Sequence, residues 1–416
     1  MMLSKPNNQA PQTPNTIRML SFLPSWEMGE RVDVSDLFAL RLARRGFDID
    51  WIMLSSPFAG GWKKTIWRNQ TAYIVGKENV KGTLGKIFGK LHEFLGMLKS
   101  VPVGLTGNYD VVQARDIFYA AVIGLIIARI KRIPFVFWLS YPFPESRLLD
   151  AKEKRSRYPV YTRWMGHSTS WLLYRVILPN ADHAFVQSEQ MKLDIMDHGI
   201  PAEKMTAVPM GVADEVFLRQ STESIEGPIV YLGTLARVRR LDVLLHAMLE
   251  VVKTVPHARL LFVGDGDAPE DRQFLEAEVK RLGLEEVVRF TGFLPMEDAW
   301  RIVDSAAICV SPFYPTPVLR STSPTKIIEY MALGKPVVVN DHPEQSRIIA
   351  ESGAGICVPW SAEAFSEAIV KLMSNPAQAA RMGQLGPAWV KQNRSYERIA
   401  DLVFERYQTI LSRTVA

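Results

Sequence analysis

Residues 321–336 read STSPTKIIEYMALGKP and place a helix shortly after a buried strand. We expect that strand at residues 306–312, and the helix to end where Gly334 and Pro336 precede the next strand at 337–339. Unpaired N–H groups in the first turn of such a helix, together with its dipole, favour an anion in the crevice beyond the strand ends. The stretch therefore predicts an α/β sheet with an anion site at a strand-to-helix junction.

Two side chains of this helix have the chemistry to hold a nucleotide diphosphate. Lys326 can meet a phosphate, and Glu329, one turn later, can accept hydrogen bonds from ribose hydroxyls. Ser or Thr followed by Glu is also an ordinary way to start a helix, so this stretch alone leaves a purely structural role open.

A second junction, residues 231–242, reads YLGTLARVRRLD and brings three arginines to one turn. Guanidinium groups match phosphate oxygens, and the helix that follows adds its dipole. We expect this loop and the 321–329 loop to open on one edge of the second sheet, so that Arg239 and Lys326 face one crevice. A cluster of surface arginines is the alternative interpretation.

Strands alternate with helical patterns along the whole chain. Strands are expected at 17–22, 47–54, 72–75, 110–113, 135–139 and 184–187, and then at 229–232, 259–263, 287–290, 306–310, 337–339 and 355–358. Helices are expected at 35–45, 117–130, 241–252, 271–282, 362–373 and 387–412. This alternation predicts an α/β fold of two doubly wound, Rossmann-like domains with sites at the carboxyl ends of the strands.

At 416 residues the chain is long enough for two domains. We expect a disordered tail at 1–16, domains at 17–205 and 206–390 with a ligand cleft between them, and a C-terminal helix at 391–416 that packs back toward the first domain. The tail lacks the apolar core of a signal peptide, and Cys309 and Cys357 lie in apolar runs without ligand-like spacing. These features predict a cytoplasmic protein in a reducing compartment.

Positive charge is concentrated in the first half of the chain. Residues 1–200 carry 26 Lys and Arg against 17 Asp and Glu, and residues 51–175 carry 19 against 7. The imbalance favours an anionic partner, although a solvated basic surface is the alternative. We expect no nucleic acid, because no recognition module is present.

Basic residues alternate with leucine and aromatic residues in two tracts, 81–99 and 155–175. Such faces favour an anionic headgroup layer, so we expect peripheral attachment to the inner face of the plasma membrane. The apolar run at 117–130 has 14 residues, too few for a membrane-spanning helix, and is expected to be a buried helix.

The turn GDGD at 264–267 superficially resembles a dinucleotide-binding turn. It lacks the third glycine of that motif and Pro269 disturbs the expected helix start, so we do not expect a nicotinamide site. Asp265 and Asp267 have a spacing that can hold a divalent ion, but a Gly-Asp turn is the commoner meaning and we expect no metal.

Taken together, the motifs resemble glycosyltransferases of family 4, retaining enzymes of the GT-B fold. The resemblance runs from about Ile17 to the C-terminus, and the segments that carry it are ADHAFVQS at 181–188, VPMGV at 208–212 with Phe217, the loop at 233–242, FVGDG at 262–266, FTGFL at 290–294 and residues 323–336.

The resemblance implies roles at matching positions. Arg239 stands where the family has a lysine on the donor diphosphate, Glu329 matches the second glutamate of Glu-x7-Glu, and Phe293 lies in the stretch whose backbone meets the nucleobase. We therefore expect catalysis from Arg239, Lys326 and Glu329. The expected donor-binding residues are Gly29, Gly233, Thr234, Arg239, Gly264, Phe293, Ser321, Thr322, Ser323, Lys326 and Glu329.

Three positions depart from the family pattern. Ser321 replaces the first glutamate of the pair, Thr234 replaces an arginine, and Ser140 or Tyr141 stands where a histidine is expected. Family members with a Ser-Pro-x-Lys-x-x-Glu-Tyr segment are known, so we interpret Ser321 as a subfamily trait with Lys326 compensating in charge.

The resemblance implies transfer, with retention, of a sugar from a UDP- or GDP-sugar to a lipid-linked or polysaccharide acceptor, without a cofactor or obligatory metal. The residues expected at the acceptor follow strand ends in the first half: Arg115, Asp116, Tyr141 and Glu145. Two alternatives stay open: a GT-B sugar-nucleotide epimerase, and a weakly catalytic partner protein that binds glycan or lipid.

Overall fold

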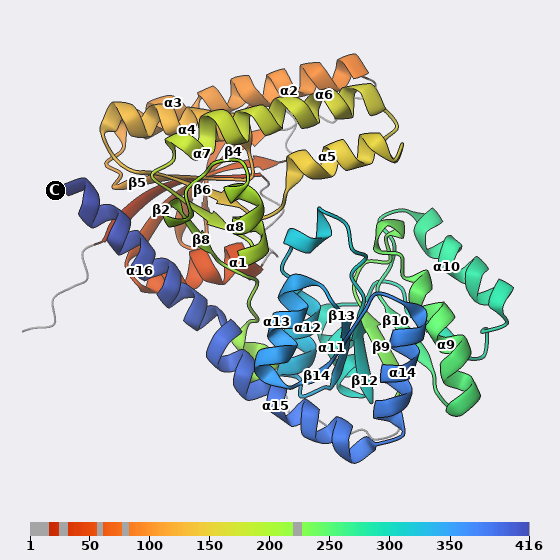
Figure 1. The fold of residues 1–416 in the computed structure, drawn as a ribbon. Helices are drawn as coiled ribbons and strands as arrows, with labels where there is room; N and C mark the ends of the chain where they lie inside the picture. The colour runs from red at the N-terminus through yellow and green to blue at the C-terminus, as the bar shows by residue number, and fades with distance from the viewer. Residues whose placement is uncertain (1–15, 25–31, 56–60, 77–82, 219–226, 416) are drawn as a thin grey trace, which may run out of the picture. The chain divides into compact units, whose positions relative to one another are not determined.

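The computed structural model describes residues 16–24, 32–55, 61–76, 83–218 and 227–415. They form two sheets with helices on their faces (Figure 1), which is the predicted α/β architecture. The chain divides into two compact units, one of Met1–Trp138, Ile177–His183 and Ala400–Ala416, the other of Leu139–Val176 and Ala184–Ile399. This division is discontinuous along the chain and differs from the predicted boundaries at 205 and 390.

The first sheet has eight strands in the order β3-β4-β2-β1-β5-β6-β7-β8. Its strands are β1 (Ile17–Leu23), β2 (Phe47–Ser55), β3 (Trp62–Trp67), β4 (Gln70–Gly76), β5 (Val111–Arg115), β6 (Phe135–Leu139), β7 (His183–Val186) and β8 (Met205–Ala207). The pairs of β1 with β2 and with β5 are parallel, with Ile17 opposite Phe47 and Met19 opposite Val111. Strand β3 pairs antiparallel with β4.

Helices accompany these strands as the alternating pattern predicts. They are α1 (Val32–Ser35), α2 (Thr83–Leu98), α3 (Ser100–Thr106), α4 (Phe118–Lys131), α5 (Phe143–Lys152), α6 (Pro159–Trp171), α7 (Leu178–Asn180) and α8 (Glu189–Met196). The helix expected at 35–45 is α1 followed by a π-helical segment, Leu37–Leu42. Most of α4 is buried, as expected for the apolar run at 117–130, although Ile126 and Ile130 are exposed.

The second sheet has six parallel strands in the order β11-β10-β9-β12-β13-β14. They are β9 (Ile229–Leu232), β10 (Leu260–Val263), β11 (Val288–Phe290), β12 (Ile308–Ser311), β13 (Val337–Asn340) and β14 (Gly355–Val358). The helices that accompany it are α9 (Asp242–Thr254), α10 (Pro269–Leu282), α11 (Met296–Asp304), α12 (Thr325–Ala332), α13 (Pro343–Ser352), α14 (Ala362–Met373) and α15 (Pro376–Arg394). The last helix, α16 (Tyr396–Val415), belongs from Ala400 onward to the first compact unit.

Both faces of the second sheet are covered (Figure 1), so its central strands β9, β12 and β13 are mostly apolar and buried, whereas the edge strand β11 contains the exposed Arg289. On one face, α9 and α14 bury Leu245 and Phe365 against the sheet. On the other face, α12 and α13 bury Ile327 and Ile348. Packing of the helices on both faces of the sheet fixes the positions of the strand ends, and therefore of the loops that follow them.

Two sequence predictions about helices were wrong. Pro269 does not disturb a helix start but begins α10, because a proline at the first helical position forfeits no hydrogen bond. The single helix expected at 387–412 is α15 followed by α16, broken at Ser395, whose backbone is extended and pairs with Val212. Within the described residues, no helix is both long and apolar enough to span a membrane.

Candidate functional site

The candidate site lies where the strand order of the second sheet reverses. Strands β9 and β12 are neighbours there, and the chain leaves β9 toward one side of the sheet and β12 toward the other. In open α/β sheets, ligands bind in the crevice beyond the carboxyl ends of such strands. The loop that starts at Gly233 and the N-terminus of α12 both follow these two strands.

Glycines bring the backbones after β9 and β10 into contact. Gly233 and Gly264 have φ of +140° and +134°, and the Gly233 amide donates to the Val263 carbonyl at 2.9 Å. A Cβ atom on Gly264 would lie 2.3 Å from the Gly233 carbonyl oxygen. A side chain at position 264 is therefore excluded, which explains the glycine in the sequence FVGDG.

Lys326 reaches from the first turn of α12 to the end of β9. Its buried ammonium group donates a hydrogen bond to the Tyr231 hydroxyl at 2.9 Å and lies 4.0 Å from the centre of the Tyr231 ring. It also lies 3.3 Å from where a Cβ atom of Gly233 would be. The prediction that the 231–242 loop and the α12 helix share one edge of the sheet is confirmed by these contacts.

Arg239 joins the same group of side chains. The Phe313 ring, in the loop after β12, lies 5.8 Å from the Arg239 guanidinium carbon and 5.3 Å from the Lys326 ammonium. Burial raises the pKa of Tyr231, and the charge of Arg239 acts against that rise. Two cations, one from the turn after β9 and one from α12, thus converge on two aromatic rings.

Burial perturbs both ionisable groups of α12. It lowers the pKa of Lys326, the charge of Arg239 lowers it further, and Glu329 acts in the opposite direction. Burial raises the pKa of Glu329 to about 7, with Lys326 opposing. Lys326 and Arg239 lie near each other at a partly buried position, which favours binding of an anion. A bound anion offsets the desolvation of the buried lysine and the repulsion between the two positive charges.

The three hydroxyl residues before α12 bind protein groups. Ser321 lies in a short 3-10 turn, Leu319–Ser321, where its hydroxyl donates to the Asp194 carboxylate and its carbonyl accepts from Ser188 at 2.7 Å. Thr322 Oγ1 donates to the Leu319 carbonyl at 2.7 Å. Ser321 is therefore not part of the first helical turn, and α12 begins only at Thr325.

Ser323 links the loop to a different helix. Its hydroxyl accepts from the Met210 amide at 3.0 Å and lies 3.3 Å from Glu344 Oε1 on α13. Of the other predicted donor residues, Thr234 accepts from the Tyr231 hydroxyl at 3.0 Å through its carbonyl, and the Phe293 ring is 84% exposed. Gly29 lies outside the described residues. A donor contact by these residues stays a prediction.

Arg115 and Asp116, two of the predicted acceptor residues, form an ion-pair network at the end of β5. Arg115 is buried, pairs with Asp33 of α1, and has its Nε 3.4 Å from Asp116. The Trp138 ring lies 5.4 Å from its guanidinium carbon. The network fits a structural role as well as an acceptor role, which stays a prediction.

The other two predicted acceptor residues belong to the second compact unit. The Tyr141 hydroxyl lies 3.3 Å from Ser146, and Glu145 Oε1 accepts from Tyr174 at 2.8 Å. Glu145 Oε2 is buried without a hydrogen-bond partner in the described part of the chain.

The GDGD segment forms a turn. Asp265 Oδ1 accepts from the Gly266 amide at 2.9 Å, and its Oδ2 lies 3.7 Å from Arg272. Across the ranges that the structure describes, no group of three or more His, Cys, Asp or Glu is arranged to hold a metal ion. That the protein needs neither a metal nor a cofactor stays a prediction.

Sequence reasoning missed Tyr231 and Phe313, which hold the two predicted cations. For Tyr231 the available signal was an aromatic residue two positions before Gly233, but spacing along a strand does not reveal which ring faces a lysine 95 residues later. Phe313 precedes no glycine in this way, so the sequence offered no such signal for it.

Two family models match consecutive parts of the chain. The model described as Glycosyltransferase Family 4 matches residues 38–216, and the model described as Glycosyl transferases group 1 matches residues 226–375. The chain belongs to glycosyltransferase family 4.

Curated relatives of this family 4 protein are distant. It is 25% identical over 217 residues to the amylovoran biosynthesis glycosyltransferase AmsK of Erwinia amylovora, covering 49% of this chain and 52% of that protein. It is 28% identical over 185 residues to the phosphatidyl-myo-inositol mannosyltransferase of Mycobacterium leprae, covering 44% and 46%. The chain spans about half the length of the curated relatives it matches.

Solved structures share the fold over nearly the whole chain. Sucrose-phosphate synthase from Thermosynechococcus elongatus matches with a TM-score of 0.71 and 19% identity, over 95% of this chain and all of that one. Anabaena HepE, solved with UDP and glucose, matches with a TM-score of 0.66 and 17% identity, over 94% and 99%. The predicted GT-B fold of family 4 is confirmed.

Proposed function

We propose that this family 4 glycosyltransferase moves a sugar from a nucleoside diphosphate sugar to a hydroxyl of a lipid-linked or polysaccharide acceptor, with retention of anomeric configuration. The observation that carries the proposal is the convergence of Lys326 and Arg239 on Tyr231 and Phe313, beside Gly233 and at the reversal of strand order. This arrangement suits a diphosphate, because two cations and the N–H groups of the first turn of α12 meet at the carboxyl ends of the strands.

In the proposed reaction, the bond between the anomeric carbon and the β-phosphate oxygen breaks, and a bond to the acceptor oxygen forms on the same face of the sugar. Negative charge grows on the β-phosphate as the first bond breaks. Lys326 and Arg239 stabilise this charge more in the transition state than in the ground state. The acceptor proton passes to the departing phosphate oxygen, so neither a protein nucleophile nor a dedicated metal is required.

Glu329 holds the donor ribose in this proposal. It follows Lys326 by one turn of α12, and the positive charge of Lys326 favours ionisation of its carboxyl group against the effect of burial. A carboxylate accepts two ribose hydroxyls in hydrogen bonds, which orients the nucleoside without taking part in bond breaking.

The nature of the donor and acceptor rests on related proteins. HepE was solved with UDP and glucose and also with UDP-glucose, which supports a UDP-sugar, although a GDP-sugar remains the alternative donor. AmsK is named for the biosynthesis of amylovoran and the mycobacterial relative for phosphatidyl-myo-inositol. These names support an acceptor that is a polysaccharide or a lipid-linked glycan.

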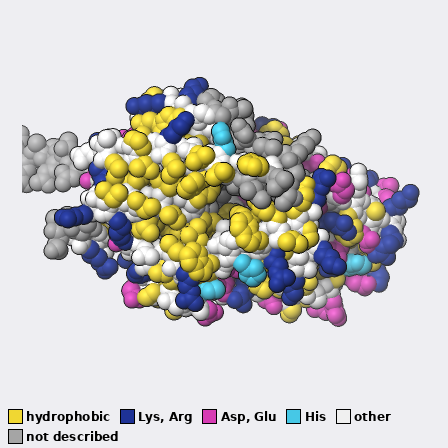
Figure 2. Space-filling model, turned by 90° about the horizontal axis from the view of Figure 1, so that it is seen from above, with side chains coloured by type: hydrophobic (Ala, Val, Ile, Leu, Met, Phe, Trp, Pro, Cys, Tyr) yellow, Lys and Arg dark blue, Asp and Glu magenta, His cyan; other side chains and the backbone are white. Residues whose placement is uncertain are grey.

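An apolar stripe on helix α2 supports peripheral attachment to a membrane, which we propose is the anionic inner face of the plasma membrane. Phe88, Leu91, Leu95 and Leu98 follow each other at helical spacing, and each is at least 39% exposed. Figure 2 shows apolar side chains gathered over this part of the molecule, with Lys and Arg at the margins. Exposure of these apolar side chains to water is unfavourable, and their transfer into the headgroup layer lowers the free energy.

Thermal denaturation with a panel of ligands tests the donor assignment. UDP, GDP, UDP-glucose and GDP-mannose are added separately, and a ligand at a hundred times its Kd adds about 2.7 kcal/mol to stability. A stabilising nucleotide sugar is then incubated with acceptor extract, and NMR of the product reports the anomeric configuration. An altered nucleotide sugar without acceptor would indicate an epimerase, and tight nucleotide binding without transfer would indicate a partner protein.

A further inference from the structure

A cavity of about 180 Å³ opens among α8, the segment that follows β8, α13 and α15. It is lined by Trp389, Pro209 and Ala207 on its apolar side, and by Glu189, Glu344 and Arg394 among its charged groups. None of these six is a predicted donor or acceptor residue. The cavity is smaller than the roughly 300–1,000 Å³ of sites for drug-sized ligands, so its occupant is one small ring or chain.

Arg394 supplies an unsatisfied donor in this cavity. The side chain is buried, and Nη2 donates to Glu344 Oε1 at 2.7 Å. Its Nη1 is also buried but has no hydrogen-bond partner among the residues that the structure describes. A buried guanidinium donor left without an acceptor is costly, which points to an oxygen supplied by something bound there.

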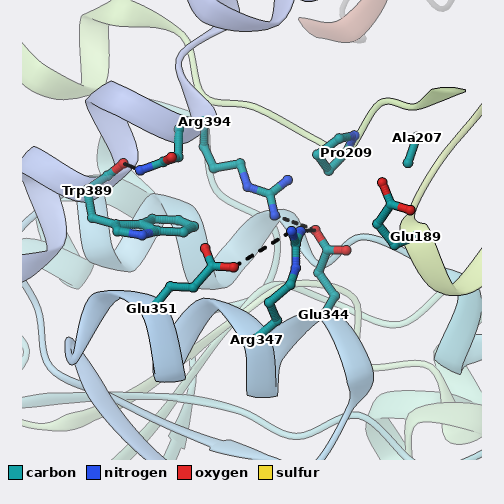
Figure 3. Close-up of a pocket in the computed structure, with 9 residues that line it drawn as sticks. Glu189, Ala207, Pro209, Glu344, Arg347, Glu351, Trp389 and Arg394 are labelled. Carbon is teal, nitrogen blue, oxygen red and sulfur yellow. Dashed lines mark hydrogen bonds and ion pairs between the residues drawn. The ribbon is translucent and has the colours of Figure 1, made fainter.

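Carboxylates face the same space (Figure 3). Glu344 and Glu189 lie on the wall beside Arg394, and Arg347 lies 3.8 Å from both Glu344 Oε1 and Glu351 Oε1. Carboxylates accept hydrogen bonds only, whereas the guanidinium donates only. An occupant must therefore present donors and acceptors on neighbouring atoms.

Hydroxyl groups meet this requirement, since each one donates and accepts. A phosphate would face three carboxylates, and a cation would face Arg347 and Arg394. The half-buried Trp389 ring, 5.8 Å from the Arg394 guanidinium carbon, gives a flat apolar wall against which the C–H face of a sugar ring can pack.

We propose that this cavity is a second carbohydrate site, which binds one uncharged sugar ring through Arg394, Glu344 and Glu189 against Trp389. The ring belongs to a free monosaccharide or to the end of a glycan. The site is separate from the donor site at Lys326 and Arg239 and goes beyond the proposed transfer reaction.

Saturation-transfer NMR on the full chain tests this proposal, with methyl α-D-glucopyranoside, methyl α-D-mannopyranoside and maltotriose as probes. Glu189→Gln and Trp389→Leu change the cavity without breaking the buried Arg394–Glu344 pair. We expect each to weaken binding of a probe at least about tenfold, as for the loss of a charged hydrogen bond or an aromatic wall. Glu203→Gln and Trp164→Leu, which remove an exposed glutamate and an exposed tryptophan elsewhere, should leave binding unchanged.

The donor-site variant Arg239→Ala should also retain this binding, which separates the second site from the first. Binding of either methyl glycoside assigns the site to a free sugar ring, whereas binding of maltotriose alone assigns it to a glycan end. Saturation transfer to none of the three probes, binding that survives both cavity variants, or preferential binding of inorganic phosphate would overturn the proposal.

Discussion

The Lys326 ammonium group donates to the Tyr231 hydroxyl at 2.9 Å and lies 4.0 Å from the centre of the same ring. Tyr231 lies in β9, whereas Lys326 lies in α12, the helix that follows β12, so the contact joins the ends of two neighbouring strands. Hydrogen bonding and the ring's quadrupole both stabilise the charged form, although burial and Arg239 act against it. A diphosphate bound between Lys326 and Arg239 would offset both the burial of the Lys326 charge and its repulsion by Arg239.

Replacement of either cation should slow turnover. We expect Lys326→Ala and Arg239→Ala each to lower kcat by about a hundredfold or more, the scale of losing one group that stabilises transition-state charge. Arg237→Ala is the matched control, because Arg237 belongs to the same turn but lies 4.5 Å from the Phe274 ring instead. Steady-state kinetics with the identified donor measures the effect, and near-normal rates in both variants would remove the leaving-group assignment.

Gly264 should tolerate no side chain. We expect Gly264→Ala to lower the free energy of unfolding by about 1–3 kcal/mol more than Gly283→Ala, the usual cost of overpacking. Both glycines have positive φ, but a Cβ atom on Gly283 meets nothing within 4 Å, whereas one on Gly264 meets the Gly233 carbonyl. Urea denaturation of the two variants provides the comparison, and equal losses would show that the backbone contact is not tight.

Donor binding should depend on the ionisation of Glu329. Its pKa is raised to about 7 by burial, and ribose hydroxyls donate to the ionised form. UDP-glucose affinity should therefore rise as pH increases through about 7, while the affinity of Glu329→Gln stays flat over that step. Calorimetric titration across this range measures it, and parallel curves for the two proteins would contradict the ribose role.

The same carboxyl affects the stability of the ligand-free protein. In the unfolded chain Glu329 ionises near its ordinary value of 4.5, but in the native protein only at about 7. The unfolded state therefore binds fewer protons between these values, and the free energy of unfolding falls as pH rises through them. Glu329→Gln should remove this fall, and its persistence in the variant would assign the fall to another group.

Membrane attachment should depend on the α2 stripe. We expect the double variant Leu91→Ser, Leu95→Ser to lose most of its co-flotation with vesicles that contain phosphatidylserine, because half-exposed leucines supply the apolar contact. Leu385→Ser, at a similarly exposed position on α15, is the control and should float as the unaltered protein does. Equal flotation of all three proteins would place the membrane contact elsewhere.

Local patterns predicted most of the fold. Uninterrupted apolar runs located β6 and β14, and the helical pattern located α14, each with the bounds that the structure has. Strand β3 was missed because its exposed, lysine-containing sequence at the sheet edge lacks an apolar run. The break at Ser395 was missed because its cause, pairing with Val212, lies 183 residues earlier in the chain.

The sequence predicted which loops form the candidate site, but not the side-chain contacts within it. Loops after β9 and β12 must meet in a parallel sheet with this strand order, so the convergence of Arg239 and Lys326 followed from topology. The orientation of Ser321 did not follow, because its partner Asp194 comes from α8 and no local pattern connects the two. Direct contacts between distant side chains are set by packing, which the spacing of motifs does not encode.

A crystal structure with UDP bound would show whether Lys326 and Arg239 share one diphosphate. We expect diphosphate oxygens within hydrogen-bonding distance of both the Lys326 ammonium and the Arg239 guanidinium, with the ribose hydroxyls donating to Glu329. A diphosphate bound elsewhere on the protein, with Lys326 still directed only at Tyr231, would contradict it.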